Sequence, residues 1–265
     1  MYETTYHKST SVEDAVAALA EAEDGKILSG GQTLVPTMKQ HLVAPSDLVD
    51  VRGIDALKGV CMDGDTVVIG AATTHADVAS NAEVQARIPG LAALANGIGD
   101  PAVRAMGTIG GSVANNDPAA DYPSAVLALG ATVVTDKREI AADDFFDGMF
   151  ATVLDEGEII TSIRFPVPSK AAYAKFPNPA SRYAMVGVFA AETGGAARVA
   201  VTGAGADGVF RHNGLEAALS GDFSEGAAAG VSVSSEGMLS DMHASAEYRA
   251  HLVGVMAKRA VAAAG

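Results

Sequence analysis

Two glycine pairs, each next to residues with hydroxyl groups, are the part of this chain best suited to chemistry. They lie in Leu28-Ser29-Gly30-Gly31-Gln32-Thr33 and in Gly107-Thr108-Ile109-Gly110-Gly111-Ser112. Glycine accepts a positive φ and has no Cβ, so such loops can turn successive backbone N–H groups toward one point. A concave row of N–H groups binds phosphate oxygens without any side-chain cation. This suits the two loops, because neither contains lysine or arginine. Either loop alone could be an ordinary turn, but the pair indicates a diphosphate held from two sides, as in a dinucleotide.

Other motifs in the chain give weaker indications. Residues 203–208 match G-x-G-x-x-G, but no βαβ unit follows them, so we do not expect a Rossmann site. The six histidines lack the spacing of a metal site, and His41 and His75 are interpreted as surface or satisfied polar groups. The single cysteine, Cys61, excludes an internal disulfide and any all-cysteine iron–sulfur or zinc site. A G-x-S-x-G elbow and a Walker A motif are both missing, so a hydrolase is not indicated.

Composition and charge restrict the binding partners and the cellular compartment that we expect for this protein. The formal net charge of −14 argues against nucleic acid and anionic membranes as partners, because their phosphates need lysine and arginine. The first residues lack the apolar run of a signal peptide. The chain also contains no apolar run of roughly 18 residues, the length that a helix needs to span a bilayer. These features predict a cytoplasmic protein without a transmembrane segment. A length of 265 residues is enough for two domains or one large one.

Hydrophobic periodicity and turn residues predict alternating helices and strands. A helix capped by Ser11 is expected to end at Gly25, and Thr73 and Thr74 are expected to cap a short helix through Val78. Further helices are expected at 89–98, 123–129, 213–219 (capped by Asn213) and 246–263, and strands at 26–28, 48–51, 66–70, 131–135, 158–165, 183–192 and 197–202. Pro166-Val167-Pro168-Ser169 indicates a boundary, so we place the main domain break near residue 167.

The ordered set of motifs resembles one protein family. The set comprises Gly30-Gly31-Gln32-Thr33-Leu34-Val35-Pro36, residues 106–112, Asp117-Pro118-Ala119-Ala120-Asp121-Tyr122-Pro123 and Asp144-Phe145-Phe146-Asp147-Gly148. It is similar to the FAD-binding medium subunit of molybdenum hydroxylases, the family of aerobic carbon monoxide dehydrogenase and xanthine dehydrogenase. The resemblance covers essentially the whole chain. It implies an α+β fold: an FAD-binding domain of the vanillyl-alcohol-oxidase type over residues 1–167, with subdomains at about 1–55 and 56–167. A smaller antiparallel-sheet-plus-helix domain would follow at 168–265.

The resemblance also implies which residues bind FAD. The two glycine loops would bind the pyrophosphate through Ser29, Gly30, Gly31, Gln32, Thr33, Thr108, Ile109, Gly110, Gly111 and Ser112. Asp121 would contact the nucleotide side and accept from ribose or ribityl hydroxyls, with Asn115 and Asp117 as loop-shaping or secondary contacts. Ile98 and Ile160 would pack on the cofactor's rings, Lys175 would approach the flavin and Tyr183 would shield one isoalloxazine face. Without the resemblance, Asp117 would be a turn residue, the isoleucines core residues and Lys175 a solvated surface lysine.

The resemblance implies an electron-transfer subunit of an oxidoreductase, with no catalytic residue and no metal of its own. Molybdenum–pterin and [2Fe–2S] clusters are expected only in a large and a small partner subunit, which would assemble with this chain as a dimer of heterotrimers. Electrons would pass from the clusters through FAD to an external acceptor. Two alternatives stay open: a self-contained FAD-dependent reductase or oxidase, and a flavin-free scaffold subunit.

The sequence predicts that FAD is bound noncovalently, because neither glycine loop contains a histidine or cysteine to which flavin could be linked. Denaturation should therefore release the whole flavin, and absorbance and mass analysis of the released fraction should identify it as FAD. Flavin retained on the polypeptide, or FMN alone, would contradict this prediction.

Overall fold

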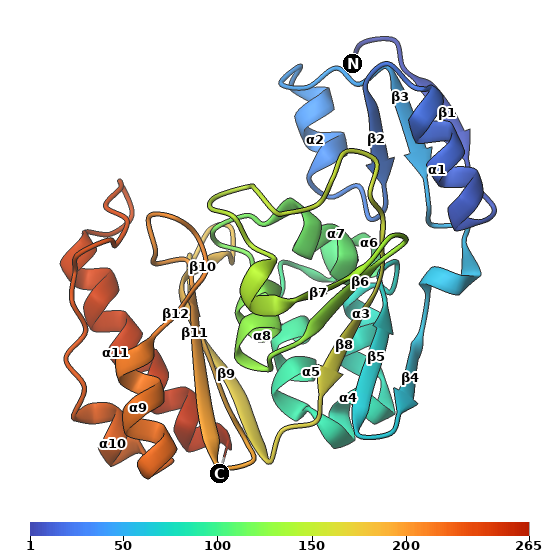
Figure 1. The fold of residues 1–265 in the computed structure, drawn as a ribbon. Coiled ribbons are helices and arrows are strands. Elements are labelled where there is room, and N and C mark those ends of the chain that lie inside the picture. The colour runs from blue at the N-terminus through green and yellow to red at the C-terminus, as the bar shows by residue number, and fades with distance from the viewer. Residues whose placement is uncertain (265) are drawn as a thin grey trace.

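A parallel three-stranded sheet forms the N-terminal part of the computed structural model, which describes residues 1–264 (Figure 1). Its strands are β1 (Thr5–Lys8), β2 (Gly25–Leu28) and β3 (Asp47–Asp50), in the order β1–β3–β2. Two helices accompany the sheet, α1 (Val12–Glu21) and α2 (Leu34–Lys39). The Ser11 side chain caps α1 as expected, but the helix ends at Glu21, because the backbone of Ala22 is extended. Gly25 is the first residue of β2, so the expected end of α1 was wrong.

A five-stranded antiparallel sheet forms the centre of the molecule, in the order β4–β5–β8–β6–β7. Its strands are β4 (Val60–Asp63), β5 (Thr66–Gly70), β6 (Thr132–Thr135), β7 (Glu139–Ala141) and β8 (Ile160–Pro166). The associated helices are α3 (His75–Ser80), α4 (Ala82–Arg87), α5 (Pro89–Asn96), α6 (Pro101–Met106), α7 (Ile109–Asn115) and α8 (Tyr122–Ala128). Two 3-10 turns, η1 (Asp55–Leu57) and η2 (Ala142–Asp144), complete this part.

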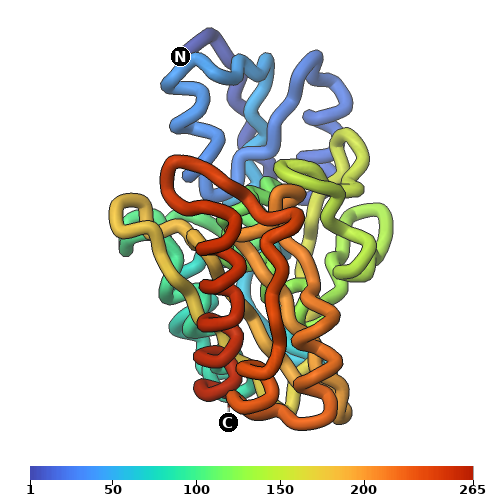
Figure 2. The backbone as a smooth tube through the Cα atoms, turned by 90° about the vertical axis from the view of Figure 1, so that its left-hand side faces the viewer, coloured from blue at the N-terminus to red at the C-terminus, as the bar shows by residue number. Residues whose placement is uncertain are grey.

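The third sheet is antiparallel, and it presents a different face to each of its neighbours. Its order is β12–β11–β10–β9, with β9 (Lys170–Pro177), β10 (Ala184–Thr193), β11 (Ala196–Thr202) and β12 (Phe210–Arg211). Side chains alternate along a strand, so Ala174 and Phe176 pack toward the helices of this part, whereas Tyr173 and Phe189 pack into the core of the central part. The covering helices are α9 (Asn213–Gly221), α10 (Glu225–Ala229) and α11 (Ala246–Ala264), which face the viewer in Figure 2.

The expected α+β class is confirmed, and most of the expected elements are present with shifted ends. The N-cap of α9 is His212, whose Nδ1 accepts from the backbone N–H of Leu215 at 3.1 Å, so the expectation of an Asn213 cap was wrong. The second glycine loop also differs from expectation, because residues 109–115 form α7. Short elements were missed altogether: β1, β4, β7, β9, β12, α2, α4, α6 and α10. None of the helices in residues 1–264 is long and apolar enough to cross a membrane.

Candidate functional site

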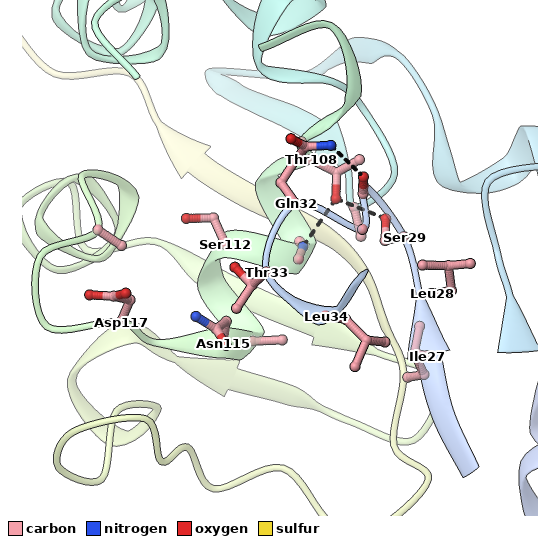
Figure 3. Close-up of a pocket in the computed structure, with 18 of the residues that line it drawn as sticks. Ile27, Leu28, Ser29, Gln32, Thr33, Leu34, Thr108, Ser112, Asn115 and Asp117 are labelled. Atoms are coloured by element: carbon pink, nitrogen blue, oxygen red, sulfur yellow. Dashed lines mark hydrogen bonds between the residues drawn. The ribbon is translucent and has the colours of Figure 1, made fainter. Parts of the chain in front are cut away.

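A cavity of about 700 Å³ lies where the N-terminal part meets the central part, and both glycine loops line it. Figure 3 shows how the first loop, with Gln32 and Thr33, faces α7 with Ser112 and Asn115. All but two of the predicted site residues line this cavity; the lining set includes Ser29, Gly30, Gly31, Gln32, Thr33, Ile98, Thr108, Gly110, Gly111, Ser112, Asn115, Asp117, Asp121, Ile160 and Tyr183. Ile109 and Lys175 do not line it, and both are accounted for below.

The first loop has the backbone geometry expected of an anion site. Gly31 has a φ of +70°, which side-chain-bearing residues rarely adopt. Within residues 1–264, the N–H groups of Gly30, Gly31, Gln32 and Thr33 donate to no protein acceptor. Gly30 is buried and Gly31 half-buried, whereas Gln32 and Thr33 are exposed, so the row opens toward solvent and can bind the oxygens of a diphosphate.

The second loop differs, because most of its N–H groups already have acceptors. Ile109 donates to the carbonyl of Thr73 at 3.1 Å, and Gly110 donates to that of Ala71 at 2.9 Å. Gly111 donates to the Thr108 hydroxyl at 3.2 Å, which is the N-cap bond of α7. Ile109 is also fully buried. The second loop therefore contributes its surface and its hydroxyl groups rather than the row of N–H groups that the sequence suggested.

The two loops touch through their backbones, and only glycine permits the contact. A Cβ on Gly30 would lie 2.5 Å from the carbonyl oxygen of Met106 and 2.6 Å from the Cα of Gly107. The hydroxyls of Ser29 and Thr108 are 2.8 Å apart and join the loops at the same place. The contact fixes the N-terminal part against the central part, and with it the width of the cavity.

Asp117 and Asp121 are two of the carboxylates at the cavity wall. Asp117 accepts from the N–H of Ala119 at 2.8 Å, and burial raises the pKa of its carboxyl group. Asp121 is 5% exposed, and the Lys175 ammonium lies 3.1 Å from its Oδ1. Burial raises the pKa of Asp121, while the charge of Lys175 opposes that rise. Both groups can accept hydrogen bonds from the hydroxyls of a dinucleotide.

Lys175 lies behind Asp121 rather than in the cavity wall. Its Nζ donates to the carbonyl of Gly97 at 2.8 Å and to that of Arg182 at 3.1 Å, in addition to its pair with Asp121. The side chain is 11% exposed, so it is not the solvated surface lysine considered above. Its contacts hold together the segments that carry Ile98 and Tyr183.

Apolar and aromatic side chains supply the rest of the predicted site. Ile160 is 6% exposed and Ile98 is half-buried, and both line the cavity. Tyr183 is 48% exposed, and its pKa is raised by burial and by the charges of Asp117 and Asp121. These groups suit the flat ring of a cofactor, whose faces need apolar contact.

His75 was misinterpreted from the sequence. It is buried, lines the cavity, and its Nδ1 has no hydrogen-bond partner among residues 1–264. Burial, reinforced by the positive charge of Arg104, lowers the pKa of its imidazole to about 4. The Thr74 cap places His75 at the first position of α3. The backbone N–H of His75 donates to the carbonyl of Gly107 at 2.9 Å. His41, in contrast, is exposed, as expected.

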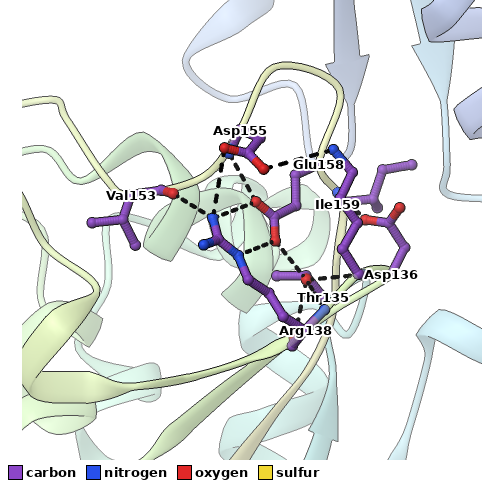
Figure 4. A network of polar contacts seen from close by, with 8 residues as sticks. Thr135, Asp136, Arg138, Val153, Asp155, Glu158 and Ile159 are labelled. Atoms are coloured by element: carbon purple, nitrogen blue, oxygen red, sulfur yellow. Dashed lines mark hydrogen bonds and ion pairs between the residues drawn. The ribbon is translucent and has the colours of Figure 1, made fainter.

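An ion pair between the buried Glu158 and the solvent-exposed Arg138 supports the cavity wall just before β8 (Figure 4). Glu158, which lines the cavity, accepts from the Nη2 of Arg138 at 2.9 Å and from the Thr135 hydroxyl at 2.7 Å. It also accepts from the N–H of Asp155 at 2.8 Å. Sequence analysis missed this group, because only the fold brings Arg138 beside the 153–158 loop. These bonds hold the pKa of Glu158 down at about 2, with the Arg138 hydrogen bond as the largest cause.

The lowered pKa of Glu158 predicts acid sensitivity. A carboxyl group whose folded-state pKa is below its unfolded value stabilises the fold above the unfolded pKa, and this contribution disappears as the pH falls through the folded value. The Glu158→Gln variant should therefore lose on the order of 2 kcal/mol of unfolding free energy at pH 7, allowing for partial solvent screening at Arg138. The loss should shrink as the pH falls from about 4.5 toward 2.

Urea unfolding at several pH values measures this difference. Glu139→Gln, on the neighbouring strand β7, is the matched control, because Glu139 is exposed. A constant difference between the Glu158→Gln variant and the parent chain across this pH range would contradict the prediction.

The cavity fits FAD on the evidence of its own residues. It offers a row of N–H groups without acceptors for the diphosphate, carboxylates for hydroxyl groups, and apolar walls with an aromatic side chain for the rings. Its volume of about 700 Å³ is of the size that holds a cofactor.

Comparisons with known proteins agree with this fit. A family model described as "FAD binding domain in molybdopterin dehydrogenase" matches residues 2–168. The chain is 36% identical to the carbon monoxide dehydrogenase medium chain of Hydrogenophaga pseudoflava, over 98% of this chain and 96% of that one. It is 34% identical to the nicotine 6-hydroxylase medium subunit of Paenarthrobacter nicotinovorans, with the same coverage of both chains, 98% and 96%.

Solved structures give the same result. Reconstituted CO dehydrogenase from Oligotropha carboxidovorans matches with a TM-score of 0.89 and 33% identity, over 99% of this chain and 97% of that chain. Quinoline 2-oxidoreductase from Pseudomonas putida 86 matches with a TM-score of 0.90 and 29% identity, over 99% and 96%. The chain therefore belongs to the family of FAD-binding subunits of molybdopterin dehydrogenases, and it is a flavoprotein component of an oxidoreductase.

Proposed function

We propose that this chain is the electron-transfer subunit of a molybdenum hydroxylase, in which bound FAD takes electrons from [2Fe–2S] clusters of a small partner subunit and passes them to an external acceptor. Substrate oxidation belongs to a molybdenum–pterin site in a large partner subunit. The chain has one cysteine, too few to hold a cluster with four cysteine ligands. Relatives that are medium chains of dehydrogenases and hydroxylases support this division of labour.

The observation that carries the proposal is the cavity between the two glycine loops. The free N–H groups of residues 30–33 would bind the diphosphate, and the oxygens of Asp117 and Asp121 would accept from cofactor hydroxyls. Ile98 and Ile160 would pack on the rings, and Tyr183 would cover one face. All of these groups would bind and orient the cofactor, and we assign none of them a role in substrate oxidation. The protein's contribution is the position and environment of a noncovalent flavin.

The similarity to carbon monoxide dehydrogenase medium chains extends over almost the whole chain, so we propose the same general assembly. This chain, an iron–sulfur subunit and a molybdenum subunit would form a heterotrimer, and two heterotrimers would form a dimer. The substrate is chosen in the large subunit, which explains how similar medium subunits serve enzymes named for carbon monoxide and for nicotine. The domain boundary near residue 167 and the cytoplasmic location stay predictions.

The assembly can be tested through the flavin absorbance. The tagged chain should copurify with a cysteine-rich iron–sulfur protein and a molybdenum protein. The physiological substrate should bleach the flavin of the full complex under anaerobic conditions, but not the flavin of the chain alone. Bleaching of the isolated chain by that substrate would instead favour a self-contained FAD-dependent reductase or oxidase.

The site itself can be tested with Gly111→Val. A Cβ on Gly111 would lie 3.0 Å from the Thr108 hydroxyl and 3.8 Å from the Cβ of Ser29, so a valine would enter the cavity between the loops. The Kd of the deflavinated complex for FAD should rise at least about tenfold, the effect of losing roughly 1.4 kcal/mol of binding, and the flavin content of the purified complex should fall with it. The thermal unfolding of the flavin-free chain should change little.

Gly254→Val is the matched control for this substitution. Gly254 also lies in a helix, α11, and nothing surrounds its missing Cβ within 4 Å. This variant should keep its flavin. Normal flavin content in Gly111→Val would mean that the cofactor binds elsewhere.

A further inference from the structure

Tyr173 makes a polar contact that the proposed function does not use. Its hydroxyl donates to Oδ1 of Asp121, the carboxylate that lines the cavity. Burial, together with the negative charge of Asp121, raises the pKa of Tyr173 well above its usual value, so the hydroxyl keeps its proton. Tyr173 itself does not line the cavity among the residues described. Any effect on a ligand must therefore act through Asp121.

The C-terminal sheet is built to deliver this contact. Tyr173 and Lys175 are two residues apart on β9, so their side chains leave the same face of the strand. Both reach Asp121, with the Lys175 Nζ 3.1 Å from Oδ1 and 3.2 Å from Oδ2. The ring of Tyr173 stacks on that of Phe189, its partner across the strands, at 6.2 Å. The carboxylate is thus held by a neutral donor and a cation from one strand.

Gly187 provides the space for the Tyr173 hydroxyl. It lies inside β10, opposite Lys175. Glycine weakens the interior of a strand, so its presence there indicates that another group approaches closely. A Cβ at this position would collide with the Tyr173 hydroxyl and would lie 2.9 Å from Cζ of the same ring. Glycine at 187 therefore lets Tyr173 extend to Asp121.

The backbone next to Asp121 is attached to the same sheet. The Thr202 hydroxyl donates to the carbonyl of Ala120 at 2.6 Å and to that of Pro118 at 3.0 Å. The N–H of Gly203 donates to the carbonyl of Pro118 at 2.8 Å. Side-chain and backbone contacts from the C-terminal part thus fix where the Asp121 carboxylate meets the cavity.

Although the resemblance implies a contact on the nucleotide side, the support of Asp121 connects it to the residues assigned to the flavin ring. Lys175, 3.1 Å from Asp121, donates to the carbonyls of Gly97 and Arg182, which adjoin Ile98 and Tyr183. The free N–H row that suits the diphosphate lies in the first glycine loop. On the basis of the proposed function, we propose that Tyr173 is a positioning residue: with Lys175, and in the space left by Gly187, it orients the Asp121 carboxylate toward the flavin half of FAD.

Tyr173→Phe tests this proposal, because it removes one hydroxyl and keeps the ring. In the deflavinated complex, the Kd for FAD should rise about tenfold, as expected for the loss of one hydrogen bond to a charged group. The visible absorption bands of the bound flavin should also shift. The Kd for ADP, measured by calorimetry, should stay within about twofold, because ADP lacks the flavin half. The thermal unfolding midpoint of the flavin-free complex should fall by a few degrees at most, because one buried hydrogen bond is lost, and should stay well above the temperature of the binding assay.

Tyr6→Phe is the matched control. Tyr6 also donates to a carboxylate, Asp50, which is paired with a cation, Arg52, but Asp50 is not among the cavity-lining residues described. This variant should leave the Kd for FAD and the flavin spectrum unchanged.

Gly187→Ala provides a second variant, which acts mainly through the same hydroxyl. The added Cβ would displace the Tyr173 hydroxyl and would also lie 2.9 Å from Cγ2 of Thr202, so it should weaken FAD binding. The loss in the double variant should be smaller than the sum of the two single losses, because Tyr173→Phe has already removed the hydroxyl. Fully additive losses would contradict the proposal.

Three results would overturn the proposal: an unchanged Kd and spectrum for Tyr173→Phe, equal losses for FAD and ADP, or a lowered unfolding midpoint that accounts for the weaker binding. A parent complex that binds no FAD would instead refute the proposed function.

Discussion

The contact between the two glycine loops is the constraint on which the rest of this structure depends. Gly30 lies against the backbone of Met106 and Gly107, so two segments far apart in sequence meet without side chains between them. This approach places the N-terminal sheet over the central part and leaves a cavity bounded by both. The loops are not equivalent, however. The first keeps a row of N–H groups for a ligand, and the second uses its N–H groups to hold its own backbone in place.

The C-terminal sheet supports the cavity wall from behind, and none of its strands lines the cavity among the residues described. One face of β9 and β10 packs into the central core, and the other packs against the helices that follow. Through Lys175 and Tyr173 the inner face reaches Asp121, and through Thr202 it holds the backbone beside that carboxylate. A buried carboxylate is costly unless it has hydrogen-bond donors and an opposite charge nearby. The sheet supplies both.

Much of this arrangement could be predicted from the sequence, because the glycine pairs and their hydroxyl neighbours have a direct physical meaning. The ordered motifs identified the family, and all but two of the predicted site residues line one cavity. The errors have physical causes. The sequence shows that Gly110 and Gly111 can bend, but not that α7 begins at Ile109, that Gly110 donates to Ala71 or that Gly111 donates to the Thr108 cap. Nothing local distinguishes the buried His75 from a surface histidine, and the partners of Glu158 and Asp121 come from distant strands.

The support that β9 gives to Asp121 from behind the cavity wall affects how this protein can be divided into modules. The family model ends at residue 168, just before the strand that carries Tyr173 and Lys175. Exchange of the first 168 residues between two such proteins would separate Asp121 from the hydrogen-bond donors that compensate its burial. Only a recipient protein with equivalent donors on its own sheet would restore them. The unit that recombination can transfer intact is therefore larger than the unit that sequence similarity delimits, and it includes the sheet as well as the nucleotide loops.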